Sequence, residues 1–219
     1  FVDVTFRAIF LLSVFPLKNL HQILFGKLLL KQAKKCANYN VNLFKDIISE
    51  QTPLIGIEPS AILSFKDEYL KLCDDLPSAK TIASQTYLIE EFIQQEIVLG
   101  NIKPAQFTLE HRIILFHGHC HQKALSNQSS SFAILNLPKN YKVTIMASGC
   151  CGMAGSFGYE KEHYHVSMNI GEQTLFPKIR KTPISTTISA NGTSCRHQIK
   201  DGTNREACHP ITILRQALV

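Results

Sequence analysis

The chain has 219 residues, of which 45% are hydrophobic and 18% are charged. This composition is typical of a folded globular protein, and no apolar run reaches the roughly 18 residues that a membrane-spanning helix needs. The net charge is +6, but no nucleic-acid-binding motif accompanies the basic residues, so nucleic acid is the least favoured anionic partner. No signal-peptide cleavage pattern follows the short apolar start, and the first residue is Phe, which suits a piece of a longer polypeptide.

Residues 1–76 are predicted to form a first α/β lobe, and residues 77–104 a helical bridge to a second lobe. The expected elements are a short strand over 1–5, a buried helix or strand over 6–15, a helix within 26–48, a strand within 52–59, a helix from Ser60 to Leu72 and a helix from Ser78 to about Leu99. Ser60 and Ser78 are suitable N-cap residues for the last two helices. The cysteines of this part, Cys36 and Cys73, are interpreted as packing residues.

Residues 105–219 repeat one unit of strand, cysteine-containing loop and helix. The predicted strands cover 112–116, 141–147 and 183–190, and the predicted helices run to Leu137, from Glu160 to Lys181, briefly after Arg196 and from Pro210. Pro210 stands at the first position of its helix, where proline is favoured. The repeat predicts an α/β fold made of two lobes of mainly parallel sheet flanked by helices. Ligand sites of such sheets lie beyond the carboxyl ends of the strands.

Four cysteines lie in the three loops that follow these strands. Cys120 lies in HGHCHQ (117–122), Cys150 and Cys151 lie in SGCCGMAGSFGY (148–159), and Cys195 lies in NGTSCR (191–196). Because the three loops leave the same edge of the sheet, we expect the thiols to converge. Converging thiolates indicate zinc or an iron–sulfur cluster, although the spacing is not the paired C-x-x-C of a zinc ribbon. A tight turn that merely buries its cysteines is the alternative.

Seven unevenly spaced cysteines favour a reducing compartment over a disulfide framework, so we expect a cytoplasmic protein or one bound at the inner face of the membrane. Residues 101–219 hold thirteen basic and six acidic residues. This positive surround suits an acidic substrate or a thiolate-ligated cluster.

Basic side chains surround the cysteines in the sequence. These side chains would stabilise thiolates and lower their pKa. They are Lys123, Arg196, His119, His121 and His197. The alternating histidines 117, 119 and 121 would share one face of an extended chain, and His119 and His121 are the favoured candidates because they flank Cys120. For each histidine, a hydrogen-bonding role is favoured over ligation. Arg196 could also bind a carboxylate with two parallel hydrogen bonds.

The strings HGHCHQKAL (117–125), GCCGMAGSFGYE (149–160), GTSCRHQIKDGTNR (192–205) and HP (209–210) closely resemble the cysteine-rich iron–sulfur domain called the CCG domain. The similarity extends over residues 45–219. Its nearest form is the C-terminal part of flavin-linked dehydrogenases for D-2-hydroxy acids such as D-lactate, D-2-hydroxyglutarate and glycolate, with glycolate oxidase among them. The resemblance implies Cys120, Cys150, Cys151 and Cys195 as ligands of a 4Fe-4S type cluster, and FAD on another domain or subunit.

Three departures from the CCG pattern stand in this chain. Ala61 occupies a position that is cysteine in many relatives, the first lobe has no double cysteine of its own, and Cys195-Arg-His-Gln198 replaces the C-x-x-C of some relatives. A second cluster in the first lobe is therefore not expected, and a histidine could replace one ligand in the second.

The resemblance implies an electron-transfer module of an oxidoreductase that is inactive without its flavin domain. No G-x-G-x-x-G fingerprint follows a strand, so the chain does not itself look like a nucleotide binder. Two alternatives stay open: a zinc-binding structural or interaction module, and a lobe that binds the hydroxy acid directly. The substrate and the electron acceptor are not determined by the sequence.

Overall fold

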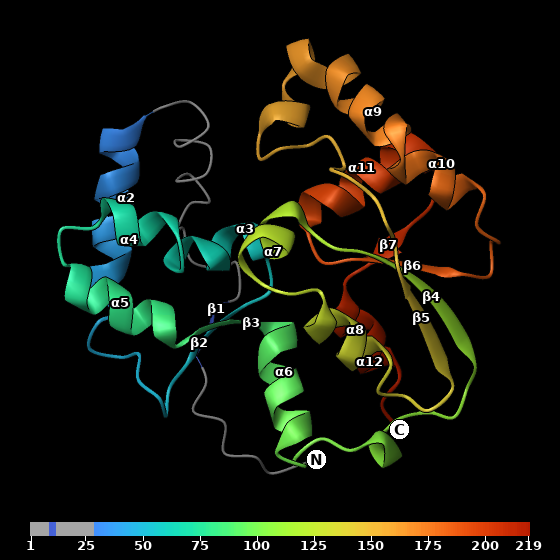
Figure 1. Cartoon of the computed structure of the whole chain (residues 1–219), viewed down its shortest axis with the longest axis horizontal. Helices are drawn as coiled ribbons and strands as arrows, with labels where there is room; N and C mark the ends of the chain where they lie inside the picture. The colour runs from blue at the N-terminus through green and yellow to red at the C-terminus, as the bar shows by residue number, and fades with distance from the viewer. Residues whose placement is uncertain (1–8, 12–28) are drawn as a thin grey trace. The chain divides into compact units, whose positions relative to one another are not determined.

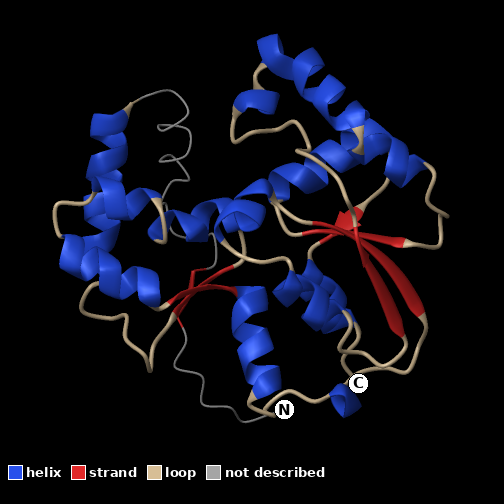
Figure 2. Cartoon of the chain, in the orientation of Figure 1, coloured by secondary structure: helices blue, strands red, loops and turns tan. Residues whose placement is uncertain are grey.

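The computed structural model describes residues 9–11 and 29–219, which form helices and parallel strands, so the predicted α/β class is confirmed (Figure 2). The chain divides into two compact units. The first comprises residues 1–57 and 61–89, and the second comprises residues 58–60 and 90–219. The division after Ile89 falls within the segment 77–104 that is expected to bridge two lobes. Over the described ranges, no helix has the length and apolar character that a bilayer crossing requires.

The first unit is built on a parallel sheet with the strand order β1-β2-β3. Its strands are β1 (Ile9–Leu11), β2 (Leu54–Gly56) and β3 (Thr86–Leu88), and its helices are α2 (Leu30–Phe44), α3 (Pro59–Ile62, shared with the second unit), η1 (Leu63–Phe65), α4 (Glu68–Leu72) and α5 (Leu76–Ser84). The helix α2 buries Ala33, Ala37, Val41 and Phe44, which lie at helical spacing on one face. The expectations for residues 1–8 and 12–28 lie outside the described residues.

Two helix predictions in the first unit are wrong in extent. The helix expected from Ser60 to Leu72 is divided into α3, η1 and α4. The helix expected from Ser78 to Leu99 is interrupted by β3, which pairs with β2 in parallel. Thr86 and Leu88 are buried in this pairing, so tertiary contacts with the sheet override a pattern that also suits a helix.

The second unit is built on a four-stranded parallel sheet with the strand order β5-β4-β6-β7. Its strands are β4 (Arg112–His117), β5 (Tyr141–Ile145), β6 (Thr187–Ala190) and β7 (Ala207–Cys208). Its helices are α6 (Ile89–Val98), η2 (Pro104–Gln106), α7 (Cys120–Leu125), α8 (Ser129–Leu135), η3 (Phe157–Tyr159), η4 (Lys161–His163), α9 (Tyr164–Gln173), α10 (Leu175–Arg180), α11 (Thr193–Thr203) and α12 (Pro210–Gln216). The strand β7 was not predicted, because two residues are too few to show a strand pattern.

Helices cover both faces of this sheet (Figure 1). The helices α8 and α12 pack together on one face, and α9, α10 and α11 pack together on the other. The strand β4 lies between β5 and β6 in the sheet. The connection that leaves β4 leads to β5 on one side, and the connection that follows β5 leads to β6 on the other side, so the connections diverge between β4 and β6. This is the switch point at which doubly wound sheets place their ligands.

Two further helix predictions differ from the structure. The predicted helix from Glu160 to Lys181 is divided into η4, α9 and α10. Pro177 has no N–H to donate to the carbonyl of residue 173, so a continuous helix would lose a hydrogen bond there. The helix expected up to Leu137 is interrupted between α7 and α8, where the Asn127 side chain accepts a hydrogen bond from the Ser129 N–H at 2.8 Å.

Candidate metal centre

The cysteine loops of the second unit leave three neighbouring strands at the same edge of the sheet. Cys120 begins α7 shortly after β4, Cys150 and Cys151 lie in the loop after β5, and Cys195 lies in the first turn of α11 after β6. Because the strands are parallel, their carboxyl ends share this edge. The switch point between β4 and β6 therefore carries Cys120 and Cys195.

The four thiols form a continuous line of contacts. Hydrogen bonds link Cys120 with Cys150, Cys150 with Cys151, and Cys151 with Cys195. The line runs from the surface into the interior, because Cys120 is exposed whereas Cys151 and Cys195 are 3% and 1% exposed. Cys36 and Cys73 lie in the first unit, apart from this line. None of the seven cysteines, all of which lie within residues 29–219, forms a disulfide.

These contacts shift the pKa values of neighbouring thiols in opposite directions. The pKa of Cys150 is lowered chiefly because Cys120 and Cys151 donate to it, and the pKa of Cys195 is lowered chiefly because Cys151 donates to it. The pKa values of Cys120 and Cys151 are raised by the same contacts and by burial. The contacts thus favour the thiolate form at Cys150 and Cys195, and thiolates are the form of cysteine that binds metal.

His117, the last residue of β4, extends this line of donors. Its side chain is 0% exposed, and one of its ring nitrogens lies within 4.8 Å of the sulfurs of Cys151 and Cys195, which are themselves within that distance of each other. Nδ1 is hydrogen-bonded to the Ser148 hydroxyl at 2.7 Å. Nε2 forms no hydrogen bond of normal geometry within residues 29–219. His117 thus forms a group of possible metal ligands with two of the thiols, a group that does not include the favoured candidates His119 and His121.

The backbone of the double-cysteine loop turns its N–H groups toward the sulfurs. The Gly152 N–H donates to Cys150 Sγ at 3.3 Å, and the N–H groups of Ala154 and Met153 lower the pKa values of Cys150 and Cys151 respectively. Gly152 has a φ of +103°, and a Cβ placed there would lie 2.1 Å from the Ser167 carbonyl oxygen. Glycine is therefore needed for this turn, which stabilises negative charge on sulfur.

Gly192 allows two of the loops to approach each other closely. A Cβ at this position would lie 2.4 Å from Cδ2 of His119 and 3.3 Å from Sγ of Cys195. The ring of His119 thus packs directly over the start of α11. His119 also caps α7, because its Nδ1 accepts the His121 N–H at 3.1 Å. This bond directs His119 Nδ1 toward its own helix and away from a ligand role.

Lys123 and Arg196 fasten the loops by hydrogen bonds to backbone carbonyls. Lys123 Nζ donates to the carbonyls of Ser148 and Gly149 at 2.9 and 3.2 Å. Arg196 donates to the carbonyls of Ala190 and Asn191 at 3.0 and 2.8 Å. Arg196 also donates to the Thr193 hydroxyl at 3.0 Å. Its guanidinium is therefore engaged by its own loop, in place of the free orientation that bidentate carboxylate binding requires.

The other histidine singled out from the sequence, His197, is exposed on α11. Its Nδ1 is hydrogen-bonded to the hydroxyl of Tyr159 at 2.8 Å. This contact joins α11 to η3, which follows the double-cysteine loop. His197 therefore acts at the rim of the site, where it links the loops that carry Cys195 and Cys151.

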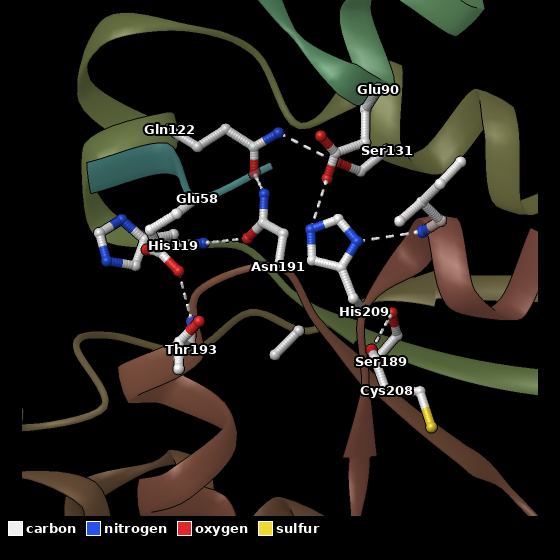
Figure 3. A network of polar contacts seen from close by, with 12 residues as sticks. Glu58, Glu90, His119, Gln122, Ser131, Ser189, Asn191, Thr193, Cys208 and His209 are labelled. Atoms are coloured by element: carbon white, nitrogen blue, oxygen red, sulfur yellow. Dashed lines mark hydrogen bonds and ion pairs between the residues drawn. The ribbon is translucent and has the colours of Figure 1, made fainter. Parts of the chain in front are cut away.

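A network of polar side chains connects the loops that follow β4 and β6 (Figure 3). The Asn191 side chain accepts the His119 N–H at 3.1 Å and donates to Gln122 at 2.8 Å, and Gln122 donates to Ser131 at 3.0 Å. Glu58 accepts the Thr193 N–H at 2.8 Å at the start of α11. These bonds fix both loops relative to each other, which sets the separation of Cys120 and Cys195.

The same view contains an acidic group that the sequence analysis missed (Figure 3). Glu90 is 0% exposed, and among the described residues its carboxylate oxygens form no hydrogen bond of normal geometry. Burial raises its pKa to about 7. Its neighbour His209 lies with Nε2 3.8 Å from Glu90 Oε1. Glu90 is adjacent to Glu91 in an acidic stretch, so no sequence signal distinguishes it from a solvated carboxylate.

The donor set suits a metal that prefers soft ligands. Four sulfurs and one imidazole lie together, and the pKa values of Cys150 and Cys195 are shifted toward the thiolate form. Around one tetrahedral ion, donor atoms with bonds of about 2.0–2.3 Å lie roughly 3.6–3.8 Å apart. The atoms of His117, Cys151 and Cys195 are already within 4.8 Å of one another, so small side-chain shifts bring them to that spacing.

Comparison with known proteins finds similarity to parts of larger dehydrogenases. The chain is 30% identical to the D-2-hydroxyglutarate dehydrogenase of Pseudomonas putida over 83% of the chain and 17% of that protein. It is 26% identical to the D-2-hydroxyglutarate dehydrogenase of Escherichia coli over 86% of the chain and 17% of that protein. It is also 26% identical to a subunit of the anaerobic glycerol-3-phosphate dehydrogenase of Escherichia coli, over 85% of the chain and 46% of that polypeptide.

The chain thus spans less than half the length of these curated relatives. No family model matches the sequence. No solved structure matches the fold.

Proposed function

We propose that the second unit holds an iron–sulfur cluster and that the chain is the electron-transfer module of a flavin-linked oxidoreductase. The observation that carries this proposal is the unbroken line of thiol contacts from Cys120 through Cys150 and Cys151 to Cys195. Its position at the switch point of a doubly wound sheet supports the proposal, because such sheets bind ligands there. The similarity to dehydrogenases supports the oxidoreductase class.

In this proposal each part of the site has a separate task. When bound, the cluster supplies a centre that accepts and passes on single electrons. Cys120, Cys150, Cys151 and Cys195 would hold the cluster; the pKa values of Cys150 and Cys195 already favour the thiolate, whereas Cys120 and Cys151 would lose their protons on ligation. The N–H groups of the double-cysteine loop stabilise the negative charge on sulfur. Cys120 lies exposed at the outer end of the line, where a redox partner can approach.

The partner in this proposal is a flavin-containing domain or subunit that oxidises the substrate. A D-2-hydroxy acid is the proposed substrate class, following the names of several relatives. Another relative is named for glycerol-3-phosphate, and the chain is similarly identical to both types. We infer that this chain contributes the electron-carrying step, which both types need, and that the substrate is recognised elsewhere. The engagement of Arg196 by its own loop supports this division of tasks.

A zinc-binding structural module is the second candidate, because His117, Cys151 and Cys195 would also suit a single zinc ion. Anaerobic purification, reconstitution with ferrous iron and sulfide, and analysis of both elements distinguish the two. An iron–sulfur centre gives acid-labile sulfide and broad visible absorption, whereas zinc has a filled d shell and gives neither. Zinc without sulfide in the anaerobically purified chain, together with failure of reconstitution, would overturn the iron–sulfur proposal.

The cellular location follows from the same chemistry and is proposed with it. Seven cysteines without a disulfide suit a reducing compartment, so we propose that the module works in the cytoplasm. Association with the inner face of the membrane stays a prediction, which fractionation of cell membranes would test.

A further inference from the structure

The buried imidazole of His117 is held by a hydrogen bond on one side of the ring. Its Nδ1 lies 2.7 Å from the Ser148 hydroxyl, and that hydroxyl lies 3.4 Å from the Met146 carbonyl oxygen. This contact fixes the orientation of the ring, so Nε2 lies on the side opposite Ser148.

The second contact of the ring is with sulfur. Nε2 is buried and forms no hydrogen bond of normal geometry within residues 29–219. A ring nitrogen lies within 4.8 Å of the sulfurs of Cys151 and Cys195, and the contact with His117, after that with Cys151, lowers the pKa of Cys195. A metal ion among these sulfurs would satisfy the nitrogen. The other ring nitrogen of a metal-binding histidine is characteristically hydrogen-bonded to an oxygen, as Nδ1 of His117 is to Ser148.

The surroundings of Ser148 hold this orientation in place. The Ser148 carbonyl accepts a hydrogen bond from Lys123 Nζ at 2.9 Å, so α7 fixes the start of the double-cysteine loop. His117 itself is held in register by the pairing of β4 with β6, opposite Ala190. The ring is thus positioned by a sheet and a fastened loop before any metal arrives. A ligand on a strand is placed more precisely than one on a mobile loop.

From this geometry we propose that Nε2 of His117 is a ligand of the metal centre, together with the sulfurs of Cys151 and Cys195. The proposal rests on the proposed function in one respect only, that these thiols bind metal. It assigns the centre a mixed nitrogen and sulfur donor set. His119, in the same loop, caps α7 with Nδ1 and packs against Gly192.

The test uses Zn²⁺ as the probe, because zinc reports its donors whether or not an iron–sulfur centre can be assembled. The metal-free full chain is loaded with one equivalent of Zn²⁺, and zinc-edge X-ray absorption determines the ligand types. We expect a nitrogen donor at about 2.0–2.1 Å beside sulfur donors at about 2.3 Å. His117→Ala should lose the nitrogen donor and bind Zn²⁺ at least about tenfold more weakly, the lower end of the loss seen when partners of a metal ligand are removed.

Two variants separate ligation from a structural role. His119→Gln, in the same loop, should keep the nitrogen donor. His117→Gly leaves a space the size of the ring, so added imidazole should restore the nitrogen donor, an effect that loss of packing alone cannot produce. The proposal would be overturned if the nitrogen donor persisted in His117→Ala or were lost only in His119→Gln. It would also be overturned if the unaltered chain bound Zn²⁺ through sulfur alone or failed to bind Zn²⁺.

The same variants distinguish this inference from the iron–sulfur proposal. If iron and sulfide fail to assemble but zinc binds through His117, the cluster proposal fails and the ligand assignment stands. If the cluster assembles equally well in the unaltered chain and in His117→Ala, with identical nitrogen couplings in electron spin-echo spectra, the ligand assignment fails and the cluster proposal stands.

Discussion

The imidazole of His209 faces the carboxylate of Glu90 in the interior of the second unit, with 3.8 Å between Nε2 and Oε1. His209 Nδ1 accepts the Ile211 N–H at 3.1 Å, which caps α12, so the ring proton lies on Nε2 and points toward Glu90. A second proton on Nδ1 would break that cap. Burial raises the pKa of the Glu90 carboxyl to about 7, so this group of the pair changes charge near neutral pH.

Glu90 should make the stability of the chain depend on pH. Its pKa is raised from 4.5 to about 7 by burial, so the folded state holds the proton more tightly than the unfolded state. The contribution of Glu90 to folding stability is therefore largest below about pH 4.5. It decreases as the pH rises from about 4.5 to about 7 and is constant at higher pH. The loss amounts to about 3 kcal/mol, from 1.36 kcal/mol per unit of pKa.

Glu90→Gln should remove this dependence, because glutamine fills the same space and does not titrate. The measurement is urea unfolding of the metal-free chain at pH 5 and pH 8, with the exposed Glu162→Gln as the matched control. We expect Glu90→Gln to be more stable than the unaltered chain at pH 8 by up to about 3 kcal/mol and Glu162→Gln to match the unaltered chain. Equal pH profiles for all three proteins would show that Glu90 is ionised at little cost.

Substitution of the paired cysteines should abolish metal binding, whereas substitution of the cysteines of the first unit should not. A serine hydroxyl cannot replace a soft thiolate ligand, but it can replace a packed thiol at small cost. Cys150→Ser and Cys151→Ser are compared with Cys36→Ser and Cys73→Ser by iron and sulfide content after reconstitution. Cys73 is a suitable control because burial and its aspartate neighbours raise its pKa to about 11. Equal metal loss in all four variants would contradict the assignment.

Gly152→Ala should destabilise the double-cysteine loop more than Gly155→Ala. Both glycines have positive φ, but a Cβ at Gly152 would lie 2.1 Å from a backbone oxygen, whereas a Cβ at Gly155 would meet nothing within 4 Å. We expect a loss of about 1–2 kcal/mol for Gly155→Ala, the cost of a left-handed residue, and a larger loss for Gly152→Ala. Urea unfolding measures both. Equal losses would mean that the loop can move away from Ser167.

The chain alone should not oxidise a hydroxy acid. Hydride transfer from such a substrate needs an organic redox cofactor, and the sequence contains no dinucleotide-binding fingerprint. The check is reduction of an artificial electron acceptor with D-lactate, D-2-hydroxyglutarate or glycerol-3-phosphate, using chain that has been reconstituted with iron and sulfide. We expect no turnover without added flavoprotein. Turnover by the pure chain would show that it contains a substrate site of its own.

The convergence of the cysteine loops was predictable because parallel strands present their following loops at one edge. The proximity of His117 to two of the thiols was not. Alternation places His117 and His119 on one face only while the chain stays extended, but β4 ends at His117 and His119 already caps a helix. The strand β3 and the buried state of Glu90 were also missed. Both depend on packing against segments distant in the sequence, which a local pattern does not report.

Cys151 and Cys195 belong to the same apolar cluster as Phe176 and Ile188, so part of the proposed ligand set is also part of the core. The sulfurs come from loops after three different strands, and Cys195 reaches Cys151 only when β6 has inserted beside β4. All four sulfurs can therefore come together around one metal centre only when the second sheet is assembled, so the proposed ligand set would be completed by the tertiary fold and not by any local segment.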